Sequence, residues 1–254
     1  MKRKIQAGTH VAPNEYKIKI VARGPYLVFG KPPLSQQFII LNAEGDSWEF
    51  REGEHYPLTA SPTALCRCGA SHRAPFCDGT HTKAEWSDSQ PSNNTSLLDE
   101  AERTEGPRLT LTDNEKYCSF ARFCDAAGRV WHNVERSDDQ TSHDLAIRQA
   151  SMCPSGRLMA WDNDSGRPFE PHYEPSLGLI EDPSMMASGG LWVRGGIPVE
   201  GADGKEYEVR NRVVLCRCGA SANKPFCDGS HAAIHFDDGL PIDAYAKDEA
   251  EATV

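Results

Sequence analysis

A 16-residue segment occurs twice in this chain of 254 residues, and each copy contains three cysteines and one histidine. The first copy, CRCGASHRAPFCDGTH, covers residues 66–81, and the second, CRCGASANKPFCDGSH, covers residues 216–231. The two copies match at 12 of 16 positions and are offset by 150 residues. This repeat predicts two equivalent modules in one chain, although the length alone would permit a single large domain.

Within each copy, the spacing C-x-C-x8-C-x3-H arranges four side chains of types that bind metals. Cys66 and Cys68 can hold one metal centre from an extended segment. Cys77 and His81 are four residues apart, so in a helix they would lie on one face. Asp78 is a favourable N-capping residue and predicts that a helix begins beside Cys77. The second copy repeats these ligand types and spacings: Cys216, Cys218, Cys227 and His231.

Both copies resemble the CDGSH iron-sulfur domain family (mitoNEET-like), whose pattern is C-x-C-x2-(S/T)-x3-P-x-C-D-G-(S/A/T)-H, and both satisfy every fixed position. The resemblance implies that each set of three cysteines and one histidine binds one [2Fe-2S] cluster. Family members with one motif pair as homodimers with intertwined strands, so the resemblance implies that the two copies form such a pair within this chain. A structural zinc ion is the alternative, because three cysteines and one histidine also form a closed zinc site.

Three further cysteines lie between the copies: Cys118, Cys124 and Cys153. The run from Cys118 to Cys124, with a distant Cys-Pro, is similar to that of single-cluster bacterial ferredoxins and of the divergent ferredoxin domain found beside CDGSH motifs. Ala121 stands where the C-x2-C-x2-C pattern of a bacterial ferredoxin has its second cysteine. Three thiolates remain, which suits a [3Fe-4S] cluster. The alternatives are a [4Fe-4S] cluster with a water or non-cysteine fourth ligand, and thiols without metal.

Charge and cysteine number exclude several other classes of protein. Nine cysteines is an odd number, which a closed disulfide framework does not explain. The formal net charge of -10 argues against nucleic acid as a partner. The N-terminal residues lack the apolar segment of a secretion signal, and the apolar stretches are too short to span a bilayer. We therefore expect a cytoplasmic protein that does not enter a membrane.

The expected fold is α+β, with two small β-rich CDGSH-type modules as an intramolecular pseudo-dimer and a small ferredoxin-like α+β domain between them. The modules would cover residues 1–86 and 174–242, the ferredoxin-like domain residues 107–173, and an acidic tail residues 243–254. A polar linker is expected at residues 87–106. Within the central domain, the pattern predicts strands at 109–111 and 158–161 and a helix at 143–150. The first copy is 15 residues longer upstream of its motif, which predicts a loop insertion around residues 44–54.

These features predict a one-electron carrier that exchanges electrons with a redox protein such as a reductase or an oxygenase. Storage, sensing or donation of clusters to an apo iron-sulfur acceptor is the alternative. The sequence contains no phosphate-binding glycine-rich loop, nucleophile elbow or H-E-x-x-H helix, so no catalytic residue is assigned and no enzyme is expected. The chain is expected to be a monomer. Arg67 and Arg217 either add positive charge near the clusters or are solvated surface residues.

Overall fold

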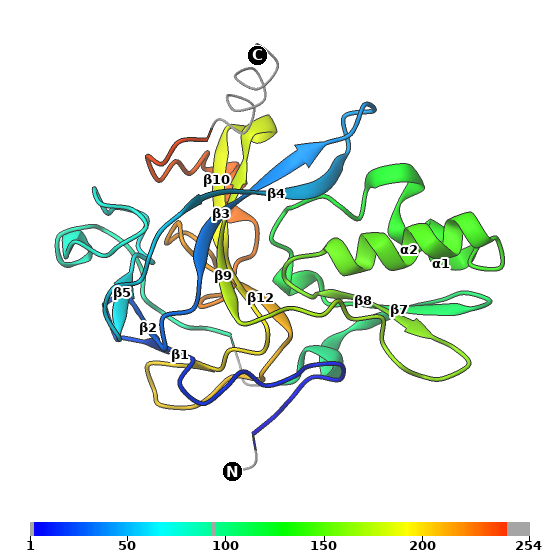
Figure 1. Ribbon diagram of the computed structural model, residues 1–254, viewed down its shortest axis with the longest axis horizontal. Coiled ribbons are helices and arrows are strands. Elements are labelled where there is room, and N and C mark those ends of the chain that lie inside the picture. Colours follow the sequence, from blue (N-terminus) through cyan, green and yellow to red (C-terminus); the bar gives the residue numbers. More distant parts are fainter. Residues whose placement is uncertain (1–2, 93–94, 243–254) are drawn as a thin grey trace.

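The strands of both copies combine in two shared sheets (Figure 1). The computed structural model describes residues 3–92 and 95–242, and three sheets lie within them. The first sheet has the order β11-β1-β2-β5, with β11 (Val199–Glu200), β1 (Lys17–Ile20), β2 (Tyr26–Phe29) and β5 (Thr63–Leu65). The second has the order β12-β10-β9-β3-β4, with β12 (Arg212–Leu215), β10 (Ala187–Arg194), β9 (Ser176–Asp182), β3 (Leu34–Leu41) and β4 (Ser47–His55).

The two copies of the repeat exchange one strand each. Strand β3, which follows β2 of the first copy, pairs in parallel with β9, and Leu34 lies opposite Leu177. In return, β11, which follows β10 of the second copy, pairs in parallel with β1, and Ile18 lies opposite Val199. The antiparallel pairs β2–β5 and β10–β12 occupy equivalent positions in the two sheets. This reciprocal exchange is the intramolecular pairing that the family resemblance implied.

One hydrophobic core joins the two shared sheets. In β1, the sequence KIKI buries Ile18 and Ile20 and directs the two lysines outward, as expected for a strand with one face in the core. Leu177 of β9 and Leu215 of β12 are fully buried in the same core. Burying a side chain of this size stabilises a fold by roughly 1.5–3 kcal/mol. Because both copies contribute to this core, we expect them to fold together.

The central unit lies beside the shared sheets and combines a three-stranded sheet with two helices (Figure 1). Its helix α2 is longer than the predicted 143–150, because Asp139 caps the helix by accepting a hydrogen bond from the backbone N–H of Ser142 at 2.8 Å. Leu109, Leu111 and Ala146 are buried in a core of this unit. The elements are β6 (Glu102–Glu105), β7 (Leu109–Asp113), β8 (Leu158–Asp162), α1 (Val130–Glu135) and α2 (Gln140–Met152). The two predicted strands and the predicted helix are confirmed, and the fold is α+β.

Two segments differ from their expected structure. The residues around 44–54, expected as a loop insertion, form the β3–β4 hairpin, with a turn in which Gly45 has a φ of +86°. In the expected linker, η2 (Leu97–Glu100) and strand β6 are present, and β6 pairs with β7. Few apolar residues mark either segment, because strands β4 and β6 are mostly partly or fully exposed, so hydrophobic periodicity did not reveal them. The boundaries of the modules themselves stay predictions.

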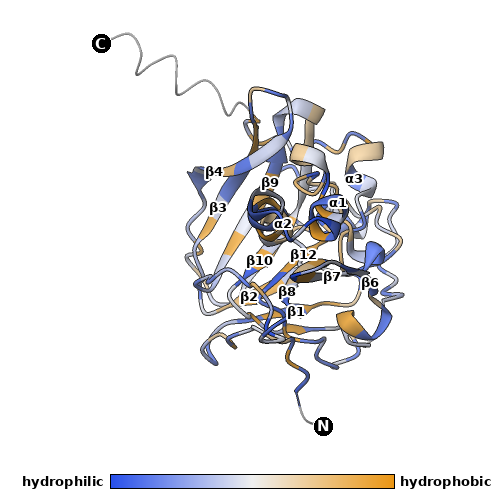
Figure 2. Cartoon of the chain, turned by 90° about the vertical axis from the view of Figure 1, so that its right-hand side faces the viewer, coloured by the Kyte–Doolittle hydropathy of each residue, from blue (hydrophilic) through white to orange (hydrophobic). Residues whose placement is uncertain are grey.

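Apolar residues are concentrated on the strands inside the molecule, as the orange segments of Figure 2 show. In the described part of the chain, no helix has the length and apolar character needed to cross a membrane. The predicted acidic tail, residues 243–254, lies outside the described residues. The short helices elsewhere are η1 (Thr80–Thr82), η3 (Glu115–Tyr117), η4 (Ala126–Gly128), η5 (Pro183–Met185) and α3 (Ser230–Ala233).

Candidate iron-sulfur sites

The first set of predicted ligands forms two close pairs. Strand β5 ends at Leu65, and the extended chain that follows directs Cys66 and Cys68 to the same side, with 3.7 Å between their Sγ atoms. The Sγ of Cys77 lies 3.3 Å from Nδ1 of His81. A bridge between Leu65 and Phe76 brings the two halves of the motif together. The structure therefore assembles all four predicted residues at the end of β5.

The second set repeats this arrangement at the end of β12. Cys216 and Cys218 have their Sγ atoms 3.8 Å apart, and Sγ of Cys227 lies 3.3 Å from Nδ1 of His231. The bridge between Leu215 and Phe226 corresponds to the one in the first set. The two sites are thus equivalent in backbone and in ligand pairing.

The pair distances fit ligands of tetrahedral metal centres. Two thiolates on one such centre, with metal–sulfur bonds of about 2.3 Å, are about 3.8 Å apart, and a thiolate and an imidazole are about 3.5 Å apart. The observed separations of 3.7 and 3.8 Å between sulfurs and 3.3 Å between sulfur and nitrogen are close to these values. Among residues 3–92 and 95–242, no three His, Cys, Asp or Glu side chains are grouped as ligands of a single ion. Each pair therefore has a separation that suits two ligands on one metal centre.

The last cysteine and the histidine converge through a glycine turn, and the predicted helix begins later than expected. Gly79 and Gly229 adopt left-handed conformations, with φ of +88° and +86°, and the helical turns η1 and α3 begin only after them. Asp78 is not the helix cap; its carboxylate accepts hydrogen bonds from the backbone N–H groups of Thr80 and His72. The helix therefore begins one residue later than predicted, with Gly79 in place of Asp78 as its N-cap, because the glycine that follows Asp78 favours the left-handed turn.

In each cysteine pair, the hydrogen bond between the two thiols lowers the pKa of one of them. In the first pair, the hydrogen bond with Cys68 lowers the pKa of Cys66 to about 6, with help from nearby backbone N–H groups. In the second pair, the hydrogen bond with Cys216 similarly lowers the pKa of Cys218 to about 7. The thiolate is the form that binds metal, so both pairs are suited to ligation.

The two sites differ in exposure. In the first site, Cys77 and His81 are partly exposed, whereas in the second Cys227 is buried and His231 is only 5% exposed. Burial, and then the charge of Arg217, lowers the pKa of His231 to about 4. The imidazole of His231 is therefore neutral at physiological pH, which is the form that binds metals.

Both arginines beside the first cysteines are buried, so the alternative of solvated surface residues is wrong. Arg67 is 2% exposed, donates to the carbonyls of Gly24 and Val21 at 2.6 and 2.9 Å, and stacks on the Trp86 ring. Arg217 is 4% exposed and forms ion pairs with two carboxylates, Glu181 at 2.9 Å and Asp238. Arg217 also lines a small hollow beside Cys66 of the other copy.

The three central cysteines line one surface hollow, together with Ala121 and Arg157. The chain between Cys118 and Cys124 wraps around this hollow, because Phe120 and Arg122 have left-handed φ values of +56° and +62°. Such turns direct backbone N–H groups inward, an arrangement that recurs at iron-sulfur sites. The N–H of Phe120 donates to the thiol of Cys118. Burial raises the pKa of Cys118, and it raises that of Cys124 to about 12. The remaining cysteine of the hollow is Cys153.

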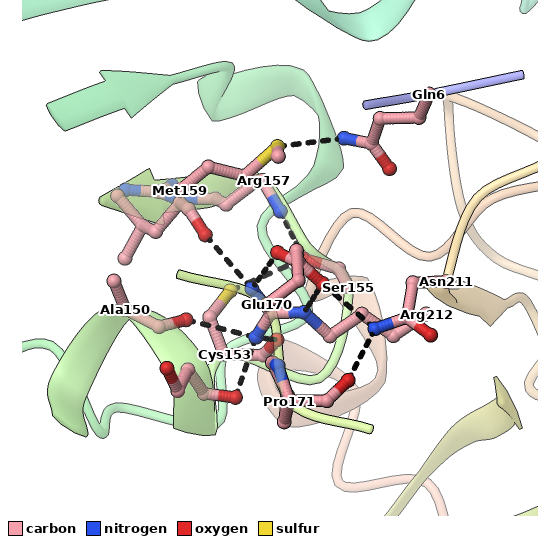
Figure 3. Close-up of polar contacts among 12 residues, drawn as sticks. Gln6, Ala150, Cys153, Ser155, Arg157, Met159, Glu170, Pro171, Asn211 and Arg212 are labelled. Atoms are coloured by element: carbon pink, nitrogen blue, oxygen red, sulfur yellow. Dashed lines mark hydrogen bonds and ion pairs between the residues drawn. The ribbon is translucent and has the colours of Figure 1, made fainter. Parts of the chain in front are cut away.

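A buried arginine that sequence analysis missed positions Cys153 (Figure 3). Arg212 of β12 is 1% exposed, and its Nη1 donates to the carbonyls of Ala150 and Cys153 at 2.8 and 2.7 Å. The guanidinium thereby caps the C-terminus of α2, where cations are favoured. Glu170 balances its charge in an ion pair of 2.7 Å. Arg212 lies four residues before Cys216, but a sequence gives no signal that an arginine is buried.

The three candidate sites contact one another through glycines. A Cβ atom on Gly69 would lie 2.5 Å from the carbonyl oxygen of Cys218, and one on Gly219 would lie 2.5 Å from that of Cys68. The backbones of the two CDGSH ligand loops are therefore in direct contact. A Cβ atom on Gly229 would lie 3.2 Å from the carbonyl oxygen of Cys118, so the second site also touches the central cysteine loop.

Comparisons with protein families agree with this division of the chain. Residues 23–82 and 188–232 match the family described as an iron-binding zinc finger of CDGSH type. Residues 104–163 match the family described as a divergent 4Fe-4S mono-cluster. No curated protein and no solved structure matches the chain. The chain is therefore an iron-sulfur protein in which two segments match the CDGSH-type iron-binding family and the segment between them matches the divergent mono-cluster family.

Proposed function

We propose that this protein is a one-electron carrier that holds two [2Fe-2S] clusters and one [3Fe-4S] cluster. Such clusters accept and release single electrons. The chain's own residues would hold the clusters, limit their contact with water and keep the three sites next to one another. The partners would be a reductase that supplies electrons and an acceptor such as an oxygenase, with the carrier acting as a monomer.

The pairing of the ligands supports [2Fe-2S] clusters over zinc in the CDGSH segments. A zinc ion needs all four ligands around one point. A [2Fe-2S] cluster instead has two irons, each bound by two protein ligands. The separations within Cys66/Cys68 and Cys77/His81 suit two ligands on one iron in each case. The second segment has the same pairing.

The lining of the central hollow supports a cluster with three protein ligands. The described residues that line it include Cys118, Cys124 and Cys153, and no further cysteine, histidine or carboxylate. Ala121 is also part of this lining, at the position of the missing ligand. Three thiolates suit a [3Fe-4S] cluster, whereas a [4Fe-4S] cluster would need a fourth ligand from solvent.

The contact between ligand segments is the observation that carries the proposal of electron transfer. Gly229 lies directly after Cys227 and Asp228 of the second site and packs on the carbonyl of Cys118. Gly69 and Gly219 pack reciprocally between the two CDGSH sites. A protein that only stored clusters would not need its sites in contact. In an electron carrier, short separations between the sites favour electron transfer from one cluster to the next.

Cluster donation is a second candidate function, and the exposure of the first site favours it. Cys77 and His81 are partly exposed, so an acceptor protein could approach this pair, whereas Cys227 and His231 are buried. In this function, the first site would release its cluster and the second would retain it. The difference between the two sites makes the two functions separable by experiment.

Anaerobically purified protein mixed with an apo-ferredoxin would test the two functions against each other. A carrier retains its visible absorption through repeated cycles of reduction by dithionite and reoxidation, and the apo-ferredoxin stays colourless. Transfer of absorption to the apo-ferredoxin within minutes would contradict electron transfer as the main function. A matched variant, His81→Ala, identifies the first site as the source if transfer occurs.

A further inference from the structure

Arg157 is a buried cation at the central site, and the ligand pattern does not assign it a role. It follows Cys153 after a turn at Gly156, where φ is +64°, and it directly precedes β8. Arg157 lines the same hollow as the thiols of Cys118 and Cys124, and its side chain is only 8% exposed. The turn therefore places the positive charge of Arg157 beside the hollow that the three cysteines line.

A two-point ion pair fixes the orientation of this guanidinium. Nε of Arg157 lies 3.0 Å from Oδ1 of Asp113, and Nη2 donates to Oδ2 at 3.1 Å. Paired contacts of this kind add geometric specificity to an arginine–carboxylate interaction. Burial raises the pKa of Asp113, and Arg157 acts against that rise. Asp113 is the last residue of β7, so the ion pair connects the end of β7 to the residue directly before β8.

The charge of Arg157 acts on the cysteines themselves. Burial raises the pKa of Cys118 and of Cys124, and the positive charge of Arg157 lowers both. In turn, although burial lowers the pKa of Arg157, the negative charges of Cys118 and Asp113 raise it overall. A buried site with three thiolates carries excess negative charge, and a nearby cation stabilises that charge where solvent cannot.

Building on the proposed function, we propose that Arg157 offsets the negative charge of the central site and thereby sets its reduction potential, and that Asp113 moderates this effect. Reduction by an external one-electron donor adds one negative charge to the site, and no bond or proton transfer is involved. A fixed guanidinium stabilises the reduced state more than the oxidised state, so it raises the potential. Asp113 carries the opposite charge and lowers it.

Redox titration of the full-length holoprotein tests this proposal, with the central-site signal followed by electron paramagnetic resonance. The variants are Arg157→Met, which removes the charge at similar length, Arg157→Lys, which keeps the charge, and Asp113→Asn, which removes the opposing charge. At the wild-type midpoint, Arg157→Met should reduce the ratio of reduced to oxidised central cluster at least tenfold, a shift of about 59 mV for one electron. In Arg157→Lys, the ratio of reduced to oxidised central cluster should remain closer to that of the wild type. Asp113→Asn should increase this ratio, opposite to the effect of Arg157→Met.

If the ion pair had only a structural role, Arg157→Met and Asp113→Asn would both lower cluster occupancy. The two variants would then not shift the reduction potential in opposite directions. If Arg157→Met does not retain the cluster, Asp113→Asn alone decides, and an unchanged or lower potential in that variant overturns the inference. The signals of the two CDGSH sites serve as internal references and should stay at their wild-type potentials. Wild-type protein without a central-site signal would overturn the proposed function together with this inference, whereas loaded variants without a shift would overturn only the inference.

Discussion

Gly69 lies so close to Cys218 that a Cβ atom on Gly69 would be 2.5 Å from the carbonyl oxygen of Cys218. The equivalent contact joins Gly219 to Cys68 at the same distance, so the two contacts are related by the internal pseudo-symmetry. Both glycines have a φ of +77°, a conformation that L side chains rarely adopt. The backbones of the two ligand loops can therefore approach each other only because neither residue has a side chain.

Gly69→Ala should destabilise the protein by about 2–4 kcal/mol, because the new methyl group clashes with a backbone atom and the left-handed conformation is strained. Gly204→Ala is the matched control. Gly204 has a φ of +79°, but a Cβ atom there meets nothing within 4 Å, so this variant has the strain without the clash. Denaturant unfolding of both variants measures the difference. Equal losses of stability in the two variants would show that the loops do not meet as described.

Leu177→Ala should weaken both CDGSH sites at once. Leu177 is fully buried in the core shared by the two copies and lies opposite Leu34 of the exchanged strand. Truncation of a buried leucine costs about 2–5 kcal/mol. In thermal unfolding followed by visible absorption and circular dichroism, the absorption of both CDGSH sites should disappear in one transition. Loss of one site while the other persists would contradict the exchange of strands.

Stability should fall between pH 4.5 and 7 because of Glu181. Burial raises the pKa of Glu181 from its ordinary 4.5 to about 7, although Arg217 lowers it; Asp238 and Tyr56 are the other titratable groups nearby. The folded protein then holds a proton that the unfolded chain has released. The stabilisation is complete below pH 4.5 and is lost as the pH rises through 7, by up to about 3 kcal/mol.

Glu181→Gln removes this titration and keeps the size of the side chain. Its free energy of unfolding should therefore decrease less than that of the wild type between pH 5 and pH 8, as measured by urea denaturation at several pH values. Parallel curves for the two proteins would indicate that Glu181 is ionised throughout this range and that its ion pair with Arg217 outweighs burial.

His231→Cys should lower the reduction potential of the second CDGSH site and leave the first site unchanged. A fourth thiolate adds one negative charge, so the potential should move towards the value of about -400 mV typical of plant-type ferredoxins. His81→Cys should have the same effect on the first site only. Spectroscopic redox titration of each variant assigns the sites individually. A variant with unaltered potential would show that the substituted histidine is not a ligand.

The proximity of the paired cysteines could be predicted from the sequence, because their spacing is a local property. Cys66 and Cys68 lie in one extended segment, so their proximity follows from two adjacent positions of the same face. The position of β3 beside β9 could not be predicted from local spacing, because the pairing of Leu34 with Leu177 connects residues far apart in the chain. The family resemblance supplied that expectation, whereas strand propensity alone does not specify a partner.

Buried charges were the least predictable part of the sites. Nothing in the sequence marks Arg157 and Arg212 as buried, because their burial depends on Asp113 and Glu170, which lie on other segments. The helix at Cys77 was predicted from four-residue spacing, but the left-handed turn at Gly79 accomplishes the same convergence over fewer helical residues. The burial of the arginines thus depends on tertiary contacts, whereas the turn follows from the local preference of Gly79, which the spacing of cysteine and histidine does not reveal.

Analysis of iron, zinc and acid-labile sulfide in anaerobically purified protein, combined with electron paramagnetic resonance of the oxidised and reduced states, tests the central claim most directly. The account predicts about seven iron atoms and eight sulfides per chain, a signal from the three-iron site when oxidised, and signals from the two CDGSH sites only after reduction. A colourless protein that contains zinc and no acid-labile sulfide would contradict it.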